Sequence, residues 1–180
     1  MPASRRLSQR ISEGDGIAII VCVDDADGAR AAEAQGAKAV AIRSHVDGIR
    51  DATSLPLLWI GDGIPSDADA VCVRPDVDRE PEQAEAVVDV RHEEELEEAL
   101  EQLDPEIFLL SALGADDDAD PLDAVLELLP DVPAGKLAIA QVDVSTREEV
   151  LALERAGIDA VLVPAQGEVA SLVGHRPLEV

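Results

Sequence analysis

Four short segments of the chain share one pattern, in which a turn of small or polar residues leads into a run of small and β-branched apolar side chains. They are QGAKAVAIRS (35–44), SDADAVCVRP (66–75), PEQAEAVVDVRH (81–92) and AGIDAVLVPAQG (156–167). Runs that are apolar on both faces are typical of parallel strands covered by helices. The repetition therefore predicts a structural period of strands and helices, and it is not in itself a functional motif.

Eight apolar runs of strand length alternate with helical or loop segments along the chain. The strands are expected at 16–23, 38–44, 55–61, 69–75, 85–91, 106–113, 136–144 and 159–163. Helices or turns are expected at 24–37, 45–53, 92–105, 121–132, 145–157 and 168–174. In the helix from 145, Glu148 stands in capping-box position to Ser145. Eight such units predict an α/β fold whose strands close into a (β/α)8 barrel.

The length of the chain limits the form that this barrel can take. The chain has 180 residues, whereas about 200 is the usual lower end for such barrels. The shortage falls around strands three to five, where two helices are reduced to loops. We therefore predict a minimal (β/α)8 TIM barrel forming a single domain over 1–180, with a polar lead-in over 1–15. The alternative is an open doubly wound parallel sheet.

Loss of covering helices should leave apolar barrel surface near strands three to five. Exposed apolar patches of this kind mark contacts with other chains or with other parts of the same chain. The sequence therefore predicts either a homodimer contact through strands three to five or a cover formed by residues 1–15.

The charge and the composition exclude several classes of partner. The formal net charge is −25, and the chain has one Phe, one Trp and no Tyr. Such a chain repels phosphate backbones and anionic membranes and lacks aromatic platforms for bases, so we expect no nucleic acid and no membrane partner. The acidity fits either simple solubility or adaptation to high salt.

The absence of a spanning segment and the cysteine usage favour a cytoplasmic protein. No apolar run approaches the roughly 18 residues of a membrane-spanning helix, and no apolar signal core follows the basic N-terminus. Cys22 and Cys72 lie inside apolar runs without metal-ligand spacing, as expected for free thiols in a reducing compartment.

Several segments carry a resemblance to a known family. They are 86–101, 105–111 and 136–165 in the C-terminal half, and more loosely 33–44 and 55–61. These segments resemble the strand ends and following helices of indole-3-glycerol phosphate synthase, the (β/α)8 lyase of tryptophan biosynthesis. The resemblance extends over well more than half of the chain and is stronger at the C-terminus.

The departures from that family concern its catalytic positions. The first strand ends in VDDAD and the third in IGDG, where the family has its catalytic lysines. The only lysines, Lys38 and Lys136, precede strands, at the end of the barrel opposite to the catalytic face of this fold. The other replacements at strand ends are Asp89 for Glu, Ser111-Ala112 for an Asn pair, Gln141-Val142-Asp143 for Glu-Ser-Gly, and Pro164 for a Gly.

The resemblance therefore implies a non-catalytic or repurposed relative of the synthase. The family's ring closure uses a cationic lysine as general acid, which this chain lacks at those positions. The alternative is an active lyase or isomerase of tryptophan or related phosphoribosyl metabolism, with Asp89 as the candidate catalytic residue.

The strand ends also bring together side chains suited to binding. Arginine forks bind carboxylate or phosphate in a bidentate manner, so we predict a small anionic or phosphorylated metabolite at the C-terminal face of the barrel. In the alternative, the arginines pair with strand-end acids in a salt-bridge layer. No metal is expected, because the acidic stretches DDAD and ADDDAD lack the spacing of a cation loop. No cofactor is expected, because the sequence has no P-loop and no G-x-G-x-x-G motif. The predicted ligand-binding residues are Arg43, Arg74, Arg91, Ser111, Gln141 and Asp143.

Overall fold

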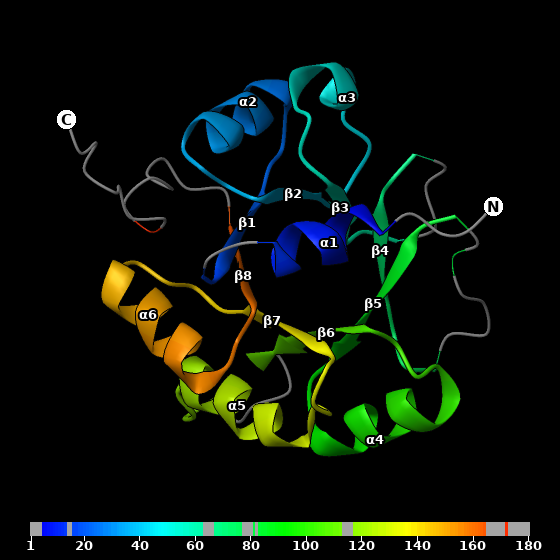
Figure 1. Ribbon diagram of the computed structural model, residues 1–180, viewed down its shortest axis with the longest axis vertical. Helices are drawn as coiled ribbons and strands as arrows, with labels where there is room; N and C mark the ends of the chain where they lie inside the picture. Colours follow the sequence, from blue (N-terminus) through cyan, green and yellow to red (C-terminus); the bar gives the residue numbers. More distant parts are fainter. Residues whose placement is uncertain are drawn as a thin grey trace.

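The structure, a computed structural model, describes residues 5–13, 16–62, 67–76, 81, 83–112, 117–164 and 172. Its centre is a closed barrel of parallel strands in sequence order, with β8 paired to β1 (Figure 1). The strands are β1 (Ala18–Cys22), β2 (Ala39–Ile42), β3 (Leu57–Trp59), β4 (Ala70–Val73), β5 (Glu85–Val90), β6 (Ile107–Ser111), β7 (Leu137–Gln141) and β8 (Ala160–Val163). The closure confirms the predicted (β/α)8 barrel over the open sheet.

Helices cover the barrel unevenly. Figure 1 shows α2 and α3 on one side of the strands and α4, α5 and α6 around the other. The helices are α1 (Arg6–Ser12), α2 (Ala26–Ala34), α3 (Ile49–Ala52), α4 (Glu93–Gln102), α5 (Pro121–Leu128), followed by the 3₁₀ turn η2 (Leu129–Asp131), and α6 (Arg147–Ala156). The described residues between β3 and β5 form no helix, which confirms the reduced form of the barrel. Within the described part of the chain, no helix is long and apolar enough to cross a membrane.

Helix α6 begins one residue later than the sequence predicted. The capping box of α6 is formed by Thr146 and Glu149, one residue later than the predicted Ser145 and Glu148. Thr146 has the extended backbone that an N-cap requires, so the helix begins at Arg147. The helix expected at 168–174 lies outside the described residues, apart from residue 172.

The strands sort their side chains into an inner and an outer set, because successive residues of a strand point to opposite faces. On β5, Val87 belongs to the apolar cluster inside the barrel, whereas Val88 and Val90 belong to the cluster between barrel and helices. Beyond the last residue of a strand, the side chain two positions after an inward-facing residue also faces the barrel axis, and it lies at the C-terminal end of the barrel. This alternation determines which side chains can form a site there.

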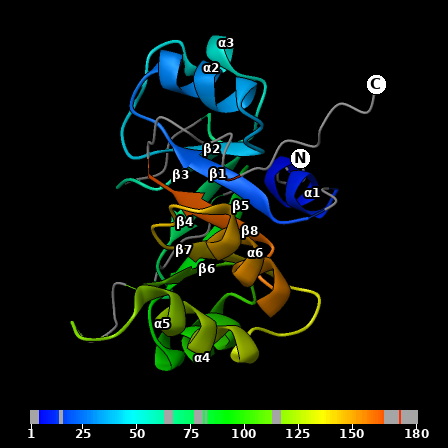
Figure 2. The same ribbon diagram turned by 90° about the vertical axis from the view of Figure 1, so that its left-hand side faces the viewer.

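The lead-in that we expected over 1–15 contains a helix, α1, which covers the N-terminal end of the barrel (Figure 2). Its residues Leu7 and Ile11, spaced four apart, are buried in the inner cluster. The predicted polar lead-in therefore also contributes two apolar side chains to the interior of the barrel. The helix also does not cover the outer face of strands three to five, because its apolar side chains point into the barrel.

The outer faces of β4 and β5 are nevertheless buried within the single chain. Val71 and Val88 have no exposed surface, and Val73 is 7% exposed. The expectation of an exposed apolar surface near these strands was thus wrong for these residues. The homodimer stays a prediction, without the support that this surface would have given.

Candidate functional site

The C-terminal mouth of the barrel holds a cavity of about 460 Å³. This volume lies within the range of roughly 300–1,000 Å³ that is common for small-molecule sites. The ends of β1, β2, β6, β7 and β8 and the starts of α5 and α6 form its walls. The location is the end at which barrels of this class carry their sites.

Four of the predicted ligand-binding residues line this cavity together. Arg43 follows the inward-facing Ala41 of β2 by two residues, and Ser111 pairs in register with Gln141 across β6 and β7. Asp143 follows Gln141 by two residues and lines the same cavity. Strand alternation therefore accounts for their shared position.

The other two predicted arginines and Asp89 form a separate ion-pair cluster. Arg74 Nη1 donates to the carboxylate and to the main-chain oxygen of Asp89, at 3.2 and 3.3 Å. Arg91 Nη2 lies 3.4 Å from the same carboxylate. Glu95, from the first turn of α4, accepts from Arg74 Nη2 and, at 2.7 Å, from the main-chain amide of Arg91. These residues do not line the mouth cavity.

This cluster corresponds to the alternative that the sequence left open, a salt-bridge layer at the strand ends. Burial opposes the charged form of Arg74, but the carboxylates of Glu95 and Asp89 outweigh it and raise the pKa of Arg74. Asp89 is 8% exposed. Its Oδ1 atom and Arg91 Nε are buried without a hydrogen-bond partner among the described residues. Sequence reasoning missed Glu95, although its place in the first turn after a strand end was a usable signal.

Arg43 has a different environment from Arg74 and Arg91. It is exposed, and among the described residues no carboxylate lies within 4.0 Å of its guanidinium. A Cβ added to Gly61 would lie 1.9 Å from the main-chain oxygen of Arg43, so this close approach requires glycine. Gly61 was also missed, because the sequence alone does not show that β2 and β3 remain in contact beyond their last paired residues.

The two thiols of the chain are poor nucleophiles. Burial raises the pKa of Cys22, which lines the cavity, although Arg43 acts in the opposite direction. Burial, together with the charge of Asp89, raises the pKa of Cys72 to about 12. Because the thiolate is the reactive form, neither residue is suited to covalent catalysis.

The described residues form no metal-ligand set, and neither lysine of the chain lies at the mouth. In the part of the chain that is described, no three His, Cys, Asp or Glu side chains are grouped to hold a metal ion. Both lysines of the chain are described: Lys38 precedes β2, and Lys136 precedes β7 and pairs with Asp104 at 3.0 Å. Both therefore lie at the N-terminal end of the barrel.

Comparisons with known proteins show to which class of fold the chain belongs. No family model and no curated protein matches the sequence. The structure is similar to that of the N-acetylmannosamine-6-phosphate 2-epimerase from Clostridium perfringens, with a TM-score of 0.62 and 16% sequence identity over 82% of this chain and 86% of the epimerase. At this identity the likeness shows the fold alone. The comparisons thus establish an eight-stranded parallel β/α barrel and give no support to a specific link with indole-3-glycerol phosphate synthase or tryptophan biosynthesis.

Proposed function

We propose that this protein is a small-metabolite-binding barrel that holds an anionic group of its ligand at Arg43. The observation that carries the proposal is a guanidinium that lines a mouth cavity of about 460 Å³ while no described carboxylate pairs with it. Guanidinium groups at such positions bind carboxylates or phosphates in a bidentate manner. Ser111 and Gln141 line the same cavity and supply neutral polar groups.

The same site argues against the ring-closure chemistry of indole-3-glycerol phosphate synthase. That chemistry uses an ammonium as general acid, and both lysines lie at the far end of the barrel. The carboxylate of Asp89, the candidate catalytic residue, is held by Arg74 and Arg91. We therefore propose a non-catalytic or repurposed barrel, for which the sequence resemblance to the synthase suggests an origin.

The standard phosphate position of these barrels lies between the loops after β7 and β8, and the described residues near it that follow offer an anion few free donors. Pro164 lines the cavity and has no N–H to donate. The amide of Leu122, in the first turn of α5, already donates to Asp120, and in α6 that of Glu149 donates to Thr146. Arg43, on the other side of the mouth, is therefore the anion-binding group in our proposal.

A thermal-shift screen tests this function. Inorganic phosphate, sugar phosphates, anthranilate and simple carboxylates are added at constant ionic strength, kept with chloride, because the net charge of −25 makes stability salt-dependent. A ligand that binds only the folded state raises the melting temperature. We expect Arg43→Gln to abolish the rise and Arg155→Gln, at the exposed C-terminal end of α6, to retain it. No rise with any anion, or an equal rise in Arg43→Gln, would overturn the proposal.

A further inference from the structure

We infer that the ligand of the mouth cavity is zwitterionic, with an amino group held by Asp143 in addition to the anionic group held by Arg43. This inference rests on the proposed function and specifies its ligand class. Its basis is the charge on the walls of the cavity. Carboxylates line the cavity together with Arg43, whereas a simple anion site would carry positive charge alone.

Arg43 and Asp143 belong to opposite parts of the cavity wall. Arg43 follows β2 and Asp143 follows β7, and in the closed barrel β1 and β8 separate these two strands. Both residues line the cavity, yet they form no ion pair within 4.0 Å. A ligand with two charged ends can therefore lie between them, whereas a single small anion reaches Arg43 alone.

Among the described acids of the cavity wall, Asp143 is the one that does not cap a helix. Three described acids line the cavity, and the other two already cap helices. Asp120 Oδ1 accepts from the amide of Leu122 at 2.8 Å, and Glu149 Oε2 accepts from the amide of Ser145 at 2.7 Å. Asp143 is exposed, and no described residue donates to it.

The balance of charge disfavours a purely anionic ligand. Among the described residues, one guanidinium and three carboxylates line the cavity, and the whole chain carries a net charge of −25. A field of this sign repels a dianion and favours an approaching cation. A ligand with one anionic and one ammonium group satisfies Arg43 and Asp143 at once and brings no excess negative charge into the mouth.

The test is calorimetric titration with three matched series of probes. The ω-amino acids H₃N⁺–(CH₂)n–COO⁻ are compared with the alkanoates that lack the amino group and with the alkylamines that lack the carboxylate. For the best chain length, we expect the amino acid to bind about ten-fold more tightly than either partner compound. The preferred chain length then reports the separation of the two charged residues.

Two variants assign the two ends of the ligand. Asp143→Asn should remove the preference for the amino acid over the alkanoate without weakening alkanoate binding, and Arg43→Gln should weaken both. Asp131→Asn makes the same charge change in the exposed turn before β7, at the opposite end of the barrel, and should leave the preference intact.

The outcomes separate this inference from the proposed function. If alkanoates bind as tightly as the amino acids, or if Asp143→Asn retains the preference, the zwitterion is excluded while anion binding at Arg43 stands. If alkylamines alone bind, or if no probe of any series and no phosphate binds, the proposed function fails and this inference fails with it.

Discussion

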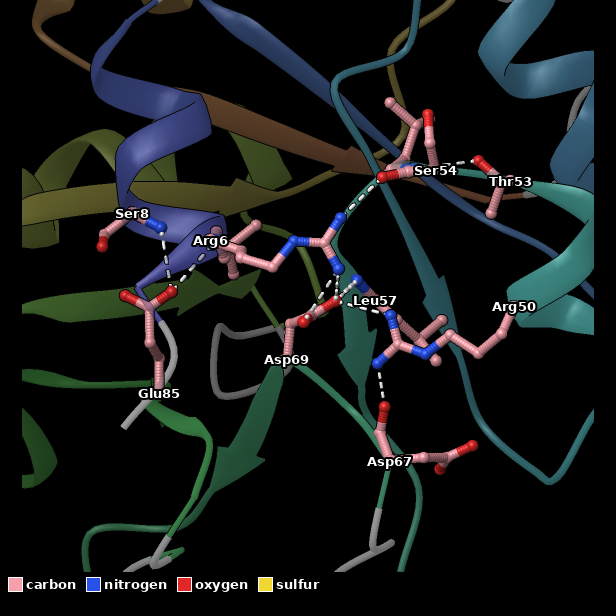
Figure 3. A network of polar contacts seen from close by, with 11 residues as sticks. Arg6, Ser8, Arg50, Thr53, Ser54, Leu57, Asp67, Asp69 and Glu85 are labelled. Carbon is pink, nitrogen blue, oxygen red and sulfur yellow. Dashed lines mark hydrogen bonds and ion pairs between the residues drawn. The ribbon is translucent and has the colours of Figure 1, made fainter. Parts of the chain in front are cut away.

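The carboxylate of Glu85, at the start of β5, accepts a hydrogen bond of 2.8 Å from the main-chain amide of Leu7. Its Oε1 atom also accepts from the amide of Ser8 at 3.1 Å. The N-cap residue of α1, Arg5, makes no side-chain capping bond. A strand residue 78 positions away therefore caps the helix that closes the N-terminal end of the barrel (Figure 3).

Replacement of Glu85 by alanine should loosen α1. The buried amide of Leu7 would lose its acceptor, and we expect the free energy of unfolding to fall by about 1–2 kcal/mol. Glu85→Gln keeps one acceptor oxygen and should cost less. Denaturant unfolding measures both, and hydrogen exchange of the α1 amides localises the effect. The exposed Glu97→Ala on α4 is the control, and an equal loss in that variant would contradict the capping role.

Asp69 forms a second anchor at the same end of the barrel. Figure 3 shows its carboxylate between the guanidinium groups of Arg6 and Arg50. The hydrogen bonds to these two arginines measure 3.2 and 2.8 Å. It also accepts from the amide of Leu57 at 2.8 Å, and it is 6% exposed. One buried carboxylate thus joins α1, α3 and β3.

Asp69→Ala should be more destabilising than the loss of either arginine. It leaves the buried amide of Leu57 without its acceptor and removes the carboxylate partner of both guanidinium groups, which keep main-chain acceptors. Because both arginines are partly exposed, we expect a loss of about 2–3 kcal/mol. Arg6→Ala alone should cost less, and the double variant should cost less than the two single losses together. Denaturant midpoints give the three values. Strict additivity would show that the pair does not interact.

The barrel itself was predictable from the sequence, whereas its closure at the N-terminal end was not. Each strand contains at least three consecutive apolar residues, so all eight were found, and the short connections between β3 and β5 predicted the reduced form. Helix α1 has only two apolar residues, Leu7 and Ile11, in a basic segment. Glu85 and Asp69, which bind this segment, are far away in sequence, and local pattern contains no such information.

The candidate site was predictable in part for the same reason. Alternation along strands placed Arg43 and Asp143 at the mouth without knowledge of the fold's details. Alternation could not predict that Arg43 lines the cavity whereas Arg74 forms ion pairs, because this difference depends on which carboxylates a long side chain reaches. Glu95 reaches Arg74 from the following helix, and its partner choice is a tertiary property.

Gly61→Ala should disturb the site through the backbone of Arg43. The added Cβ would meet the main-chain oxygen of Arg43 at 1.9 Å, and a backbone atom cannot move aside without shifting β2. We expect lower stability, by about 1–3 kcal/mol as for other overpacked positions, and weaker binding of any ligand held by Arg43. Thermal melts with and without ligand measure both effects.

Gly48→Ala separates this clash from simple backbone strain. Gly48 has φ of +74° with nothing within 4 Å of an added Cβ, so only a strain of about 1–2 kcal/mol is expected there. Ligand binding should be unchanged in that variant. Equal loss of binding in both variants would rule out a specific contact between Gly61 and Arg43.

Asp159 and Glu33 should give the protein two opposite pH dependences. Burial raises the pKa of Asp159, although the amide of Ala138, which donates to it at 2.9 Å, acts in the opposite direction. The hydroxyl of Ser54 lowers the pKa of Glu33. A raised pKa means that the folded state holds the proton more tightly, so Asp159 stabilises the fold below its ordinary pKa, and this stabilisation is lost as pH rises through the folded-state value. Glu33 stabilises the fold above its ordinary pKa and loses this effect as pH falls through its folded-state value.

The two substitutions should therefore change the free energy of unfolding in opposite directions at neutral pH. Asp159→Asn keeps an acceptor for Ala138 and removes a half-buried charge, so its free energy of unfolding relative to the parent should rise as pH increases from acid to neutral. For Glu33→Gln, the free energy of unfolding relative to the parent should fall over the same increase in pH from acid to neutral. Denaturant unfolding at several pH values measures the differences, and NMR titration of the two carboxyl carbons reports each pKa directly. A pKa of Asp159 at or below the ordinary aspartate value would contradict the assignment, because burial would then not dominate its environment.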